Sequence, residues 1–400
     1  MAIGGFNADL SVSYELDAIT RLLATRDSNV FGHVSEVFTV TPLNSCVAQV
    51  LQQEHAVLQS YLQQQGFSQG VVEHQPGKPW RLRYSTEPVI SLSIILVAGT
   101  DIHQLQCCIT TLFEQTHQPV CQLIVIVTPA TSEAITAWLT TNLSTASVNI
   151  NILKSHGSQT QEAAINEAVG QAEGEFLLLL DPRVLFVSRG WLEALACHAL
   201  RHDVVCVAPH IINLDSQILC AGEILGVRGL AFPVGYAERW GNAGYLSRYQ
   251  SDCSYSTLAT DCLLIRKDRW LEVGGFDTAY TQPLLARLDL NLRLVQQGGR
   301  AICTPYSVVA KQEAVTDFPP QYALSPSQEL DRFYHAWLPV LADDPAYNKN
   351  LSLNRTLFTA DSTLVTGWNP LKPSETRTVI LSRRIRIILA CSDLSSRWTG

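Results

Sequence analysis

The sequence of 400 residues lacks the features that mark three large classes of protein. No apolar run approaches the ~20 residues that a membrane span requires, and the run at 176–180 stops at Asp181. The first thirty residues show no basic start followed by an apolar segment, so no secretory signal is visible. The 28 Lys and Arg are outnumbered by 36 Asp and Glu, which disfavours a nucleic-acid surface. We therefore expect a cytoplasmic protein with no membrane span and no nucleic-acid partner.

The eleven cysteines lack the paired spacing that marks a metal site. Several of them lie instead in apolar runs, at Cys121, Cys206, Cys262 and Cys303. We expect buried, reduced thiols, which agrees with an intracellular location. The composition, 46% hydrophobic and 16% charged, allows one large core or two ordinary ones, so the chain is expected to be globular.

Strand and helix patterns alternate from residue 92 onward. Five apolar β-type runs are present, at 92–97, 122–127, 149–153, 176–180 and 204–208. Helical spacings separate them, at 102–113, 132–139, 161–172 and 190–202. This alternation predicts an α/β fold with a doubly wound, mostly parallel sheet. Such a sheet binds ligands at the carboxyl ends of its strands, so the residues to inspect are 98–101, 127–131 and 181–183.

The patterns after this sheet are less regular. Residues 215–255 are rich in glycine and aromatics, as a loop region on the acceptor side of a site would be. A strand is predicted at 257–265, and helices at 267–273 and 284–296. Residues 316–383 form a C-terminal extension with one helix near 328–338. A new β-type run begins at 384, so we expect 384–400 to be the start of a further domain.

Three ordered matches indicate an internal repeat. Residues 3–7 (IGGFN) resemble 273–277 (VGGFD), and 17–22 match 289–294 once two residues are inserted. The third match pairs 32–37 with 303–308. We infer a duplication, in which residues 1–45 are the remnant of a preceding domain of the same type and 46–90 are a helical linker.

Several segments carry a resemblance to a known family. They are 93–96 and 108–116 in the opening strand and helix, GEFLLLLD at 174–181, and then 221–226, 262–266, 274–277 and 289–293. Together they make residues 91–315 similar to a family-2 glycosyltransferase domain of the GT-A fold. The segment 344–352 resembles the one that follows such domains in multi-domain polysaccharide-assembly proteins. The resemblance implies inverting transfer of a sugar from a nucleotide-sugar donor to a glycan acceptor, with neighbouring glycosyltransferase domains as partners.

The nucleotide and metal positions implied by this resemblance are largely replaced. Family members hold the base with an Asp after the second strand, where this sequence has Val127. Their D-x-D motif, which binds ribose and a divalent metal (Mg or Mn), corresponds to Asp181-Pro182-Arg183, so Asp181 is the one metal ligand left from that motif. A His that commonly completes the metal site corresponds to Lys311. Arg183 and Lys311 could instead hold a diphosphate directly, through charge-assisted hydrogen bonds, or they are drifted surface residues.

The catalytic position is replaced as well. The acidic base of the family lies two residues before the Asp that matches Asp289, and this sequence has Arg287 there. Arginine stays protonated, whereas a general base is typically worth ~10²–10⁴-fold in rate. Asp289 is a weak catalytic candidate, since a carboxylate near a helix N-terminus is favourable by itself. In the partial copy, Glu15 keeps an acid two residues before Asp17.

Three interpretations remain open. The chain transfers sugar in surface-polysaccharide assembly through a degenerate active site, or it is a non-catalytic module, a pseudoenzyme, that binds nucleotide or glycan or scaffolds active neighbours. The third is a truncated, non-functional fragment. No cofactor is certain, and a divalent metal is expected for the family but not for this copy. Three further polar residues are interpreted as solvated: His156, Asp215 and Glu223.

Overall fold

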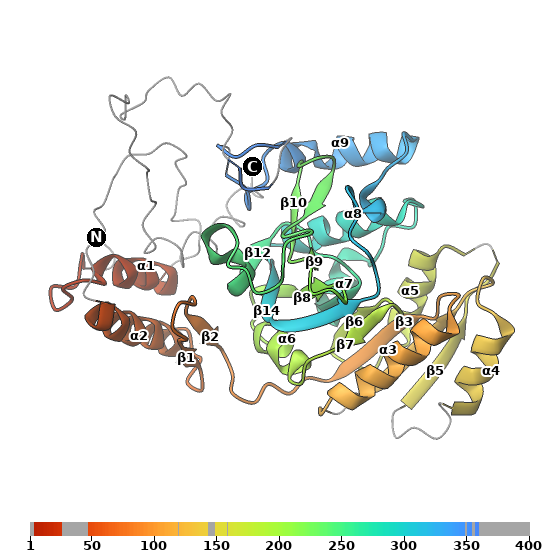
Figure 1. Ribbon diagram of the computed structural model, residues 1–400, viewed down its shortest axis with the longest axis horizontal. Helices are drawn as coiled ribbons and strands as arrows, with labels where there is room; N and C mark the ends of the chain where they lie inside the picture. Colours follow the sequence, from red (N-terminus) through yellow and green to blue (C-terminus); the bar gives the residue numbers. More distant parts are fainter. Residues whose placement is uncertain are drawn as a thin grey trace.

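The computed structural model describes residues 4–25, 47–118, 120–142, 149–157, 159–348, 350–353 and 357–359. Their central sheet contains β3 (Leu92–Val97), β4 (Gln122–Val127), β5 (Asn149–Lys154), β6 (Phe176–Leu180), β7 (Val184–Phe186), β8 (Val204–Ile212), β9 (Ile218–Cys220), β12 (Cys253–Tyr255), β13 (Cys262–Arg266) and β14 (Arg300–Lys311). The order is β12-β14-β8-β13-β6-β3-β4-β5, with β7 paired to β14 and β9 to β8 (Figure 1).

The sheet confirms the predicted α/β class. Strands β6, β3, β4 and β5 run parallel to one another, and β14 runs parallel to β8. The strand β13 lies between β6 and β8 and is antiparallel to both. Because of this inserted strand, the start of β13 lies at the same edge as the carboxyl end of β6.

Both faces of the sheet are buried, which explains why its strands read as continuous apolar runs. Alternate residues of a strand point to opposite faces. Ile94 of β3 lies in a core with residues of α3 (Ile102–Gln115) and α6 (Trp191–Ala199). Its neighbour Ile95 lies in a second core, with residues of α5 (Gln161–Gly170) and α8 (Pro283–Gln296). The molecule is therefore layered as helices, sheet and helices.

Local signals fix where the helices begin. Asp101 caps α3, because its side chain accepts hydrogen bonds from the backbone N–H of His103 and Gln104. Thr160 caps α5 in the same way, and α8 begins at Pro283, a favoured first helical residue. The other elements after residue 130 are α4 (Glu133–Asn142), β10 (Glu223–Leu225), β11 (Ala231–Pro233), η3 (Tyr245–Gln250), α7 (Lys267–Val273), η4 (Pro320–Tyr322) and α9 (Gln328–Ala342).

The N-terminal residues form a small unit with its own core. It contains α1 (Tyr14–Thr25), α2 (Val47–Gln64), β1 (Val71–Glu73) and β2 (Arg81–Arg83). The antiparallel strands β1 and β2 pair with each other, and the buried residues of the unit are Leu16, Val57, Leu58, Leu62 and Val72. In Figure 1 this unit lies to one side of the sheet, apart from α4 and β5.

The inferred repeat is supported by shared local geometry. Gly4 and Gly5 have φ of 74° and 86°, and the matching Gly274 and Gly275 have 77° and 71°. Left-handed backbone of this kind favours glycine, so both turns require this residue type. The helix after each turn carries an ion pair four residues apart, Arg21–Asp17 at 2.6 Å in one and Arg293–Asp289 at 2.7 Å in the other. Each arginine also donates to a backbone carbonyl of its turn, that of Gly5 or Val273.

The described residues between 316 and 348 pack on the sheet domain. The carboxylate of Asp344 is buried and accepts hydrogen bonds from the backbone N–H of Leu225 at 2.7 Å and from Ser256 Oγ at 2.7 Å. The Trp337 indole on α9 donates to Asp289 on α8. The division of the chain into 1–45, 46–90, 91–315, 316–383 and 384–400 stays a prediction. The third repeat match at 32–37 and the expected start of a domain at 384–400 lie outside the described residues.

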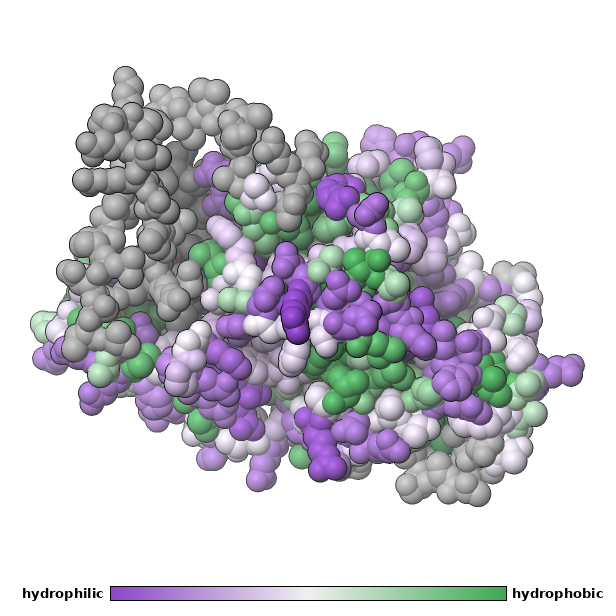
Figure 2. All heavy atoms as spheres, in the orientation of Figure 1, coloured by the Kyte–Doolittle hydropathy of each residue, from purple (hydrophilic) through white to green (hydrophobic). Residues whose placement is uncertain are grey.

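The surface of the described residues shows no extended apolar belt in the view of Figure 2, where hydrophilic and apolar residues are interspersed. None of the helices in the described ranges combines the length and the hydropathy that crossing a bilayer would require.

Candidate functional site

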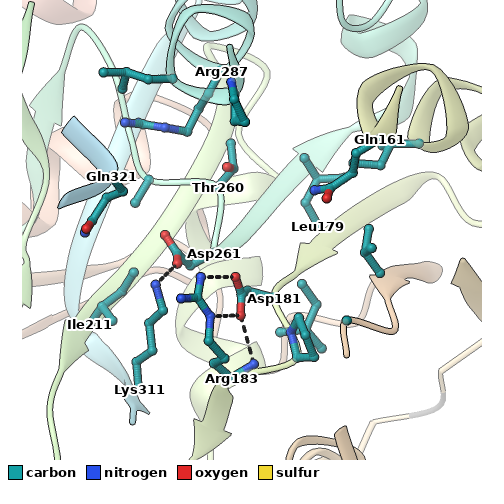
Figure 3. Close-up of a pocket in the computed structure, with 18 of the residues that line it drawn as sticks. Gln161, Leu179, Asp181, Arg183, Ile211, Thr260, Asp261, Arg287, Lys311 and Gln321 are labelled. Carbon is teal, nitrogen blue, oxygen red and sulfur yellow. Dashed lines mark hydrogen bonds and ion pairs between the residues drawn. The ribbon is translucent and has the colours of Figure 1, made fainter. Parts of the chain in front are cut away.

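A cleft of about 440 Å³ opens at the carboxyl ends of β3 and β6 (Figure 3). Gly99 and Thr100 line it after β3, and 181–183 line it after β6, as expected for a sheet of this type. The N-terminal turns of α5 and α8 also face it, through Gln161 and Leu284. The cleft is therefore the candidate functional site.

Asp181 is already engaged by its neighbour in sequence. Its Oδ1 accepts hydrogen bonds from the backbone N–H of Arg183 at 2.8 Å and from Arg183 Nε at 2.9 Å. Its Oδ2 accepts from Arg183 Nη2 at 2.7 Å. This bidentate contact raises the pKa of the Arg183 guanidinium above its ordinary value. Both oxygens of this carboxylate, which the sequence predicted as a ribose or metal ligand, are thus hydrogen-bonded to the guanidinium of Arg183.

Lys311 lies at the end of β14 with its ammonium group between two carboxylates. Nζ donates to Asp261 Oδ1 and lies 2.9 Å from Glu313 Oε2. The side chain of Lys311 is only 5% exposed. Burial by itself would lower the pKa of this ammonium, but the charges of Asp261 and Asp181 outweigh burial and raise it above its ordinary value. Lys311 is therefore a fixed positive charge inside the cleft.

Asp261 lines the cleft, although no motif in the sequence pointed to it. It directly precedes β13, and its backbone carbonyl accepts a hydrogen bond from the Asp181 N–H at 2.8 Å. The antiparallel insertion of β13 brings it there. The signal that could have found it is the strand pattern at 257–265, whose start would meet the end of β6 only if that strand ran antiparallel.

The position that matches the catalytic base of the family holds a buried ion pair. Arg287 Nη1 lies 2.6 Å from Glu223 Oε2 and also donates to the carbonyl of Leu258 at 3.2 Å. The hydroxyl of Tyr322 donates to the other oxygen of Glu223. The sequence interpretation of Glu223 as a solvated residue is wrong, because its side chain is 0% exposed. Glu223 lies on β10, and Tyr322 of η4 contacts it from a segment 99 residues further along the chain.

This ion pair leaves no proton acceptor at the position that the family resemblance assigns to the base. Burial would lower the pKa of Arg287, but Glu223 outweighs burial and raises it above its ordinary value. The guanidinium therefore stays protonated, and both oxygens of its partner carboxylate accept hydrogen bonds.

Two other predicted site residues lie away from the cleft lining. Val127 ends β4 and is 8% exposed, packed in the core that contains α3. Asp289 is buried in α8, where its oxygens accept from Arg293 Nε at 2.7 Å and Trp337 Nε1 at 3.0 Å. Neither is among the residues that line the cleft. Their functional roles stay predictions, and the geometry gives Asp289 a structural contact between α8 and α9.

Replacing Asp289 with asparagine is expected to lower the free energy of unfolding by about 1 kcal/mol, because the charge-assisted bond to Arg293 is lost. Binding of a ligand in the cleft should not change. Urea denaturation and a nucleotide titration measure the two effects, with Asp268→Asn as the control, since Asp268 is 51% exposed in its pair with Arg266. A loss of binding at unchanged stability would contradict the structural role.

Part of the cleft lining is apolar or carries a neutral amide. Ile95, Ile165 and Leu179 contribute apolar surface, and Gln161 contributes an amide. Glu162 also lines the cleft, and burial raises the pKa of its carboxyl, which favours the neutral form. A planar, uncharged ring is the kind of group that such a wall fits.

The residues present do not fit the divalent metal that the family resemblance implies. A divalent ion needs several free oxygen ligands. Asp181 is taken by Arg183, and Asp261 and Glu313 are taken by Lys311. In the part of the chain that the structure describes, no three His, Cys, Asp or Glu side chains are grouped as a metal site. A metal would have to displace an internal cation.

Two curated proteins are similar to this chain. Protein y4gI of Sinorhizobium fredii (strain NBRC 101917 / NGR234), described as uncharacterized, is 24% identical over 286 residues, which are 71% of this chain and 31% of that protein. O-antigen biosynthesis protein RfbC of Myxococcus xanthus is 25% identical over 312 residues, which are 75% of this chain and 23% of that protein. The chain thus spans less than a third of the length of either relative. No family model matches the sequence.

The solved structure of GalNAc-T7 with UDP, GalNAc and Mn²⁺ has a similar fold. It matches with a TM-score of 0.52 and 15% sequence identity, over 79% of this chain and 61% of that chain. At this identity the likeness concerns the fold alone. The chain has the GT-A fold of glycosyltransferases, as the resemblance in sequence predicted.

Proposed function

We propose that this chain is a family-2-type glycosyltransferase module of surface-polysaccharide assembly, and that its cleft binds a nucleotide-sugar donor. The GT-A fold and the similarity to the O-antigen biosynthesis protein RfbC support a glycosyltransferase role. The cleft supports the donor, because it joins an apolar wall to a cluster of charged groups at the strand ends. Neighbouring glycosyltransferase domains of a longer protein are its expected partners.

We further propose that this module binds without catalysing the usual transfer. One observation carries this part: Arg287 stands at the base position in a buried ion pair with Glu223. Inverting transfer needs a group that takes the proton of the acceptor hydroxyl. A protonated guanidinium cannot do so, and the Glu223 carboxylate is buried and paired with Arg287. The module then serves to bind donor or glycan, or to scaffold active neighbours.

Residual sugar transfer is the second candidate. The observation that favours it is the presence of two other carboxylates in the same cleft, Asp261 and Glu313, with side chains 24% and 17% exposed. Either would have to release Lys311 before it could accept a proton. This rearrangement separates the second candidate from the first.

A binding assay and a turnover assay test the proposal together. Calorimetry with UDP and with GDP is expected to show binding of one of them to the purified chain. Release of free nucleoside diphosphate from the matching nucleotide-sugar is expected to stay at the level without protein, with or without added glycan. Release that depends on protein and is abolished by Asp261→Asn would establish the second candidate instead. Absence of binding by both nucleotides would contradict the donor assignment.

A further inference from the structure

Three carboxylates converge on one corner of the cleft, and they come from three separate elements. Asp181 follows β6, Asp261 precedes β13, and Glu313 follows β14. Figure 3 shows Asp181 and Asp261 pointing toward the side chains of Arg183 and Lys311. Three acids and two bases leave this corner with a formal charge of −1, so most of its charge is compensated from within.

The ammonium of Lys311 is what makes this convergence possible. Carboxylates close together repel, and each disfavours the ionised form of the other unless a cation lies between them. Burial would raise the pKa of Asp261, yet Lys311 outweighs burial and lowers it below its ordinary value. The nearly buried Lys311 side chain contacts Asp261 and Glu313 directly, whereas Arg183 is 43% exposed and reaches Glu313 only at 3.9 Å.

We propose that the Lys311 ammonium takes the place of a divalent cation between the carboxylates of Asp261 and Glu313, which form a carboxylate cradle around it. The cleft then holds its ligand without metal, and a divalent-cation site forms only when this lysine is removed. The inference rests on the proposed function in one respect, because the ligand is taken to be the diphosphate of a nucleotide.

The ammonium and a metal ion exclude each other for a geometric reason. A divalent ion such as Mn²⁺ or Mg²⁺ binds carboxylate oxygens directly, at about 2.0–2.6 Å. The Nζ of Lys311 already hydrogen-bonds to oxygens of Asp261 and Glu313. Lysine is a compact charge with three donors, and one donor beyond these two contacts is available for a phosphate oxygen.

The first experiment titrates MnCl₂ alone into the folded chain and its variants, followed by calorimetry and by the shift in melting temperature. The wild-type chain and Lys154→Met, at an exposed lysine that ends β5, are expected to bind no ion in the cleft. Lys311→Met is expected to bind Mn²⁺ at least about tenfold more tightly than the wild-type chain does, since the carboxylates of Asp261 and Glu313 lose their cation. Adding Asp261→Asn to Lys311→Met should abolish this gain.

The opposite results would overturn the inference. Wild-type binding of Mn²⁺ as tight as that of Lys311→Met, and lost in Asp261→Asn, would show that the ion displaces the lysine. Lys311→Arg keeps the charge and is expected to behave as wild type, so a gain of Mn²⁺ affinity there would also contradict the proposal. If Lys311→Met folds only when Mn²⁺ is added, that dependence supports the cradle. In that case the Mn²⁺ titrations of the wild-type chain and of Lys311→Arg still test the proposal.

The second experiment titrates UDP and GDP into the wild-type chain, once with EDTA and once with MnCl₂. Affinities that agree within about twofold are expected, because the Lys311 ammonium already occupies the place between Asp261 and Glu313 where a metal ion would bind. Binding about tenfold tighter with Mn²⁺ would overturn the inference. Failure of both nucleotides to bind counts against the donor assignment alone, and the Mn²⁺ titration then decides the role of Lys311.

Discussion

Replacing Arg287 with methionine is expected to lower the free energy of unfolding by about 3–5 kcal/mol. The variant leaves the Glu223 carboxylate charged and 0% exposed, with Tyr322 as its remaining polar contact. Removing one member of a buried ion pair costs this much because the other charge stays desolvated. Urea denaturation of both proteins measures the difference.

A second variant and a control sharpen this prediction. The double variant Arg287→Met, Glu223→Leu is expected to recover most of the loss, because apolar residues of similar size often replace a buried pair at little cost. Arg269→Met removes a surface pair with Glu272, 50% exposed, and should cost less than about 1 kcal/mol. A loss at Arg287 no larger than that at Arg269 would show that the pair at the base position is not buried in solution.

Acid is expected to destabilise the protein through His210 on β8. This side chain is 1% exposed, and burial lowers the pKa of its imidazole to about 4, with a smaller opposing effect from Asp252. The unfolded chain takes up the proton near pH 6.5, while the folded chain resists it until about pH 4. The free energy of unfolding is therefore not reduced by His210 above pH 6.5, and it falls as the pH decreases from 6.5 toward 4.

The expected loss between pH 7 and pH 4.5 is about 2.5 kcal/mol for this residue. Urea denaturation at steps of pH measures it, and His210→Asn is the matched variant, since asparagine carries no proton in this range. The free energy of unfolding should fall by about 2.5 kcal/mol less in the variant than in the wild type between pH 7 and pH 4.5. Equal losses in the two proteins would assign the acid sensitivity to other groups.

The positive charges of the cleft are compensated by carboxylates of the same chain. Arg183 is paired with Asp181, Lys311 with Asp261, and Arg287 with Glu223. By the resemblance in sequence, Arg183 and Arg287 stand where an acidic residue is expected, and Lys311 stands where a His is expected. In the structure each has gained an acidic partner, so the cleft has not become strongly basic. This arrangement fits a module that binds rather than one that moves protons.

The parallel strands β3, β4, β5 and β6 were predictable to within one residue, whereas β7, β9 and β12 were not predicted. The runs at 92–97, 122–127 and 176–180 coincide with β3, β4 and β6, because a strand buried on both faces must be apolar throughout. The antiparallel direction of β13 could not be read, since a short apolar run has the same pattern in either direction. Asp261 was missed for that reason.

The sequence by itself determined the alternation of strands and helices and the glycine turns at residues 4–5 and 274–275. These follow from local periodicity and from backbone angles that only glycine tolerates well. Only the tertiary structure decided which charged side chains pair with one another. Lys311 and Asp261 are 50 residues apart in sequence, and Arg287 and Glu223 are 64 apart. Coulombic attraction depends on distance in space and on burial, and both are set by how the sheet and the last helices pack.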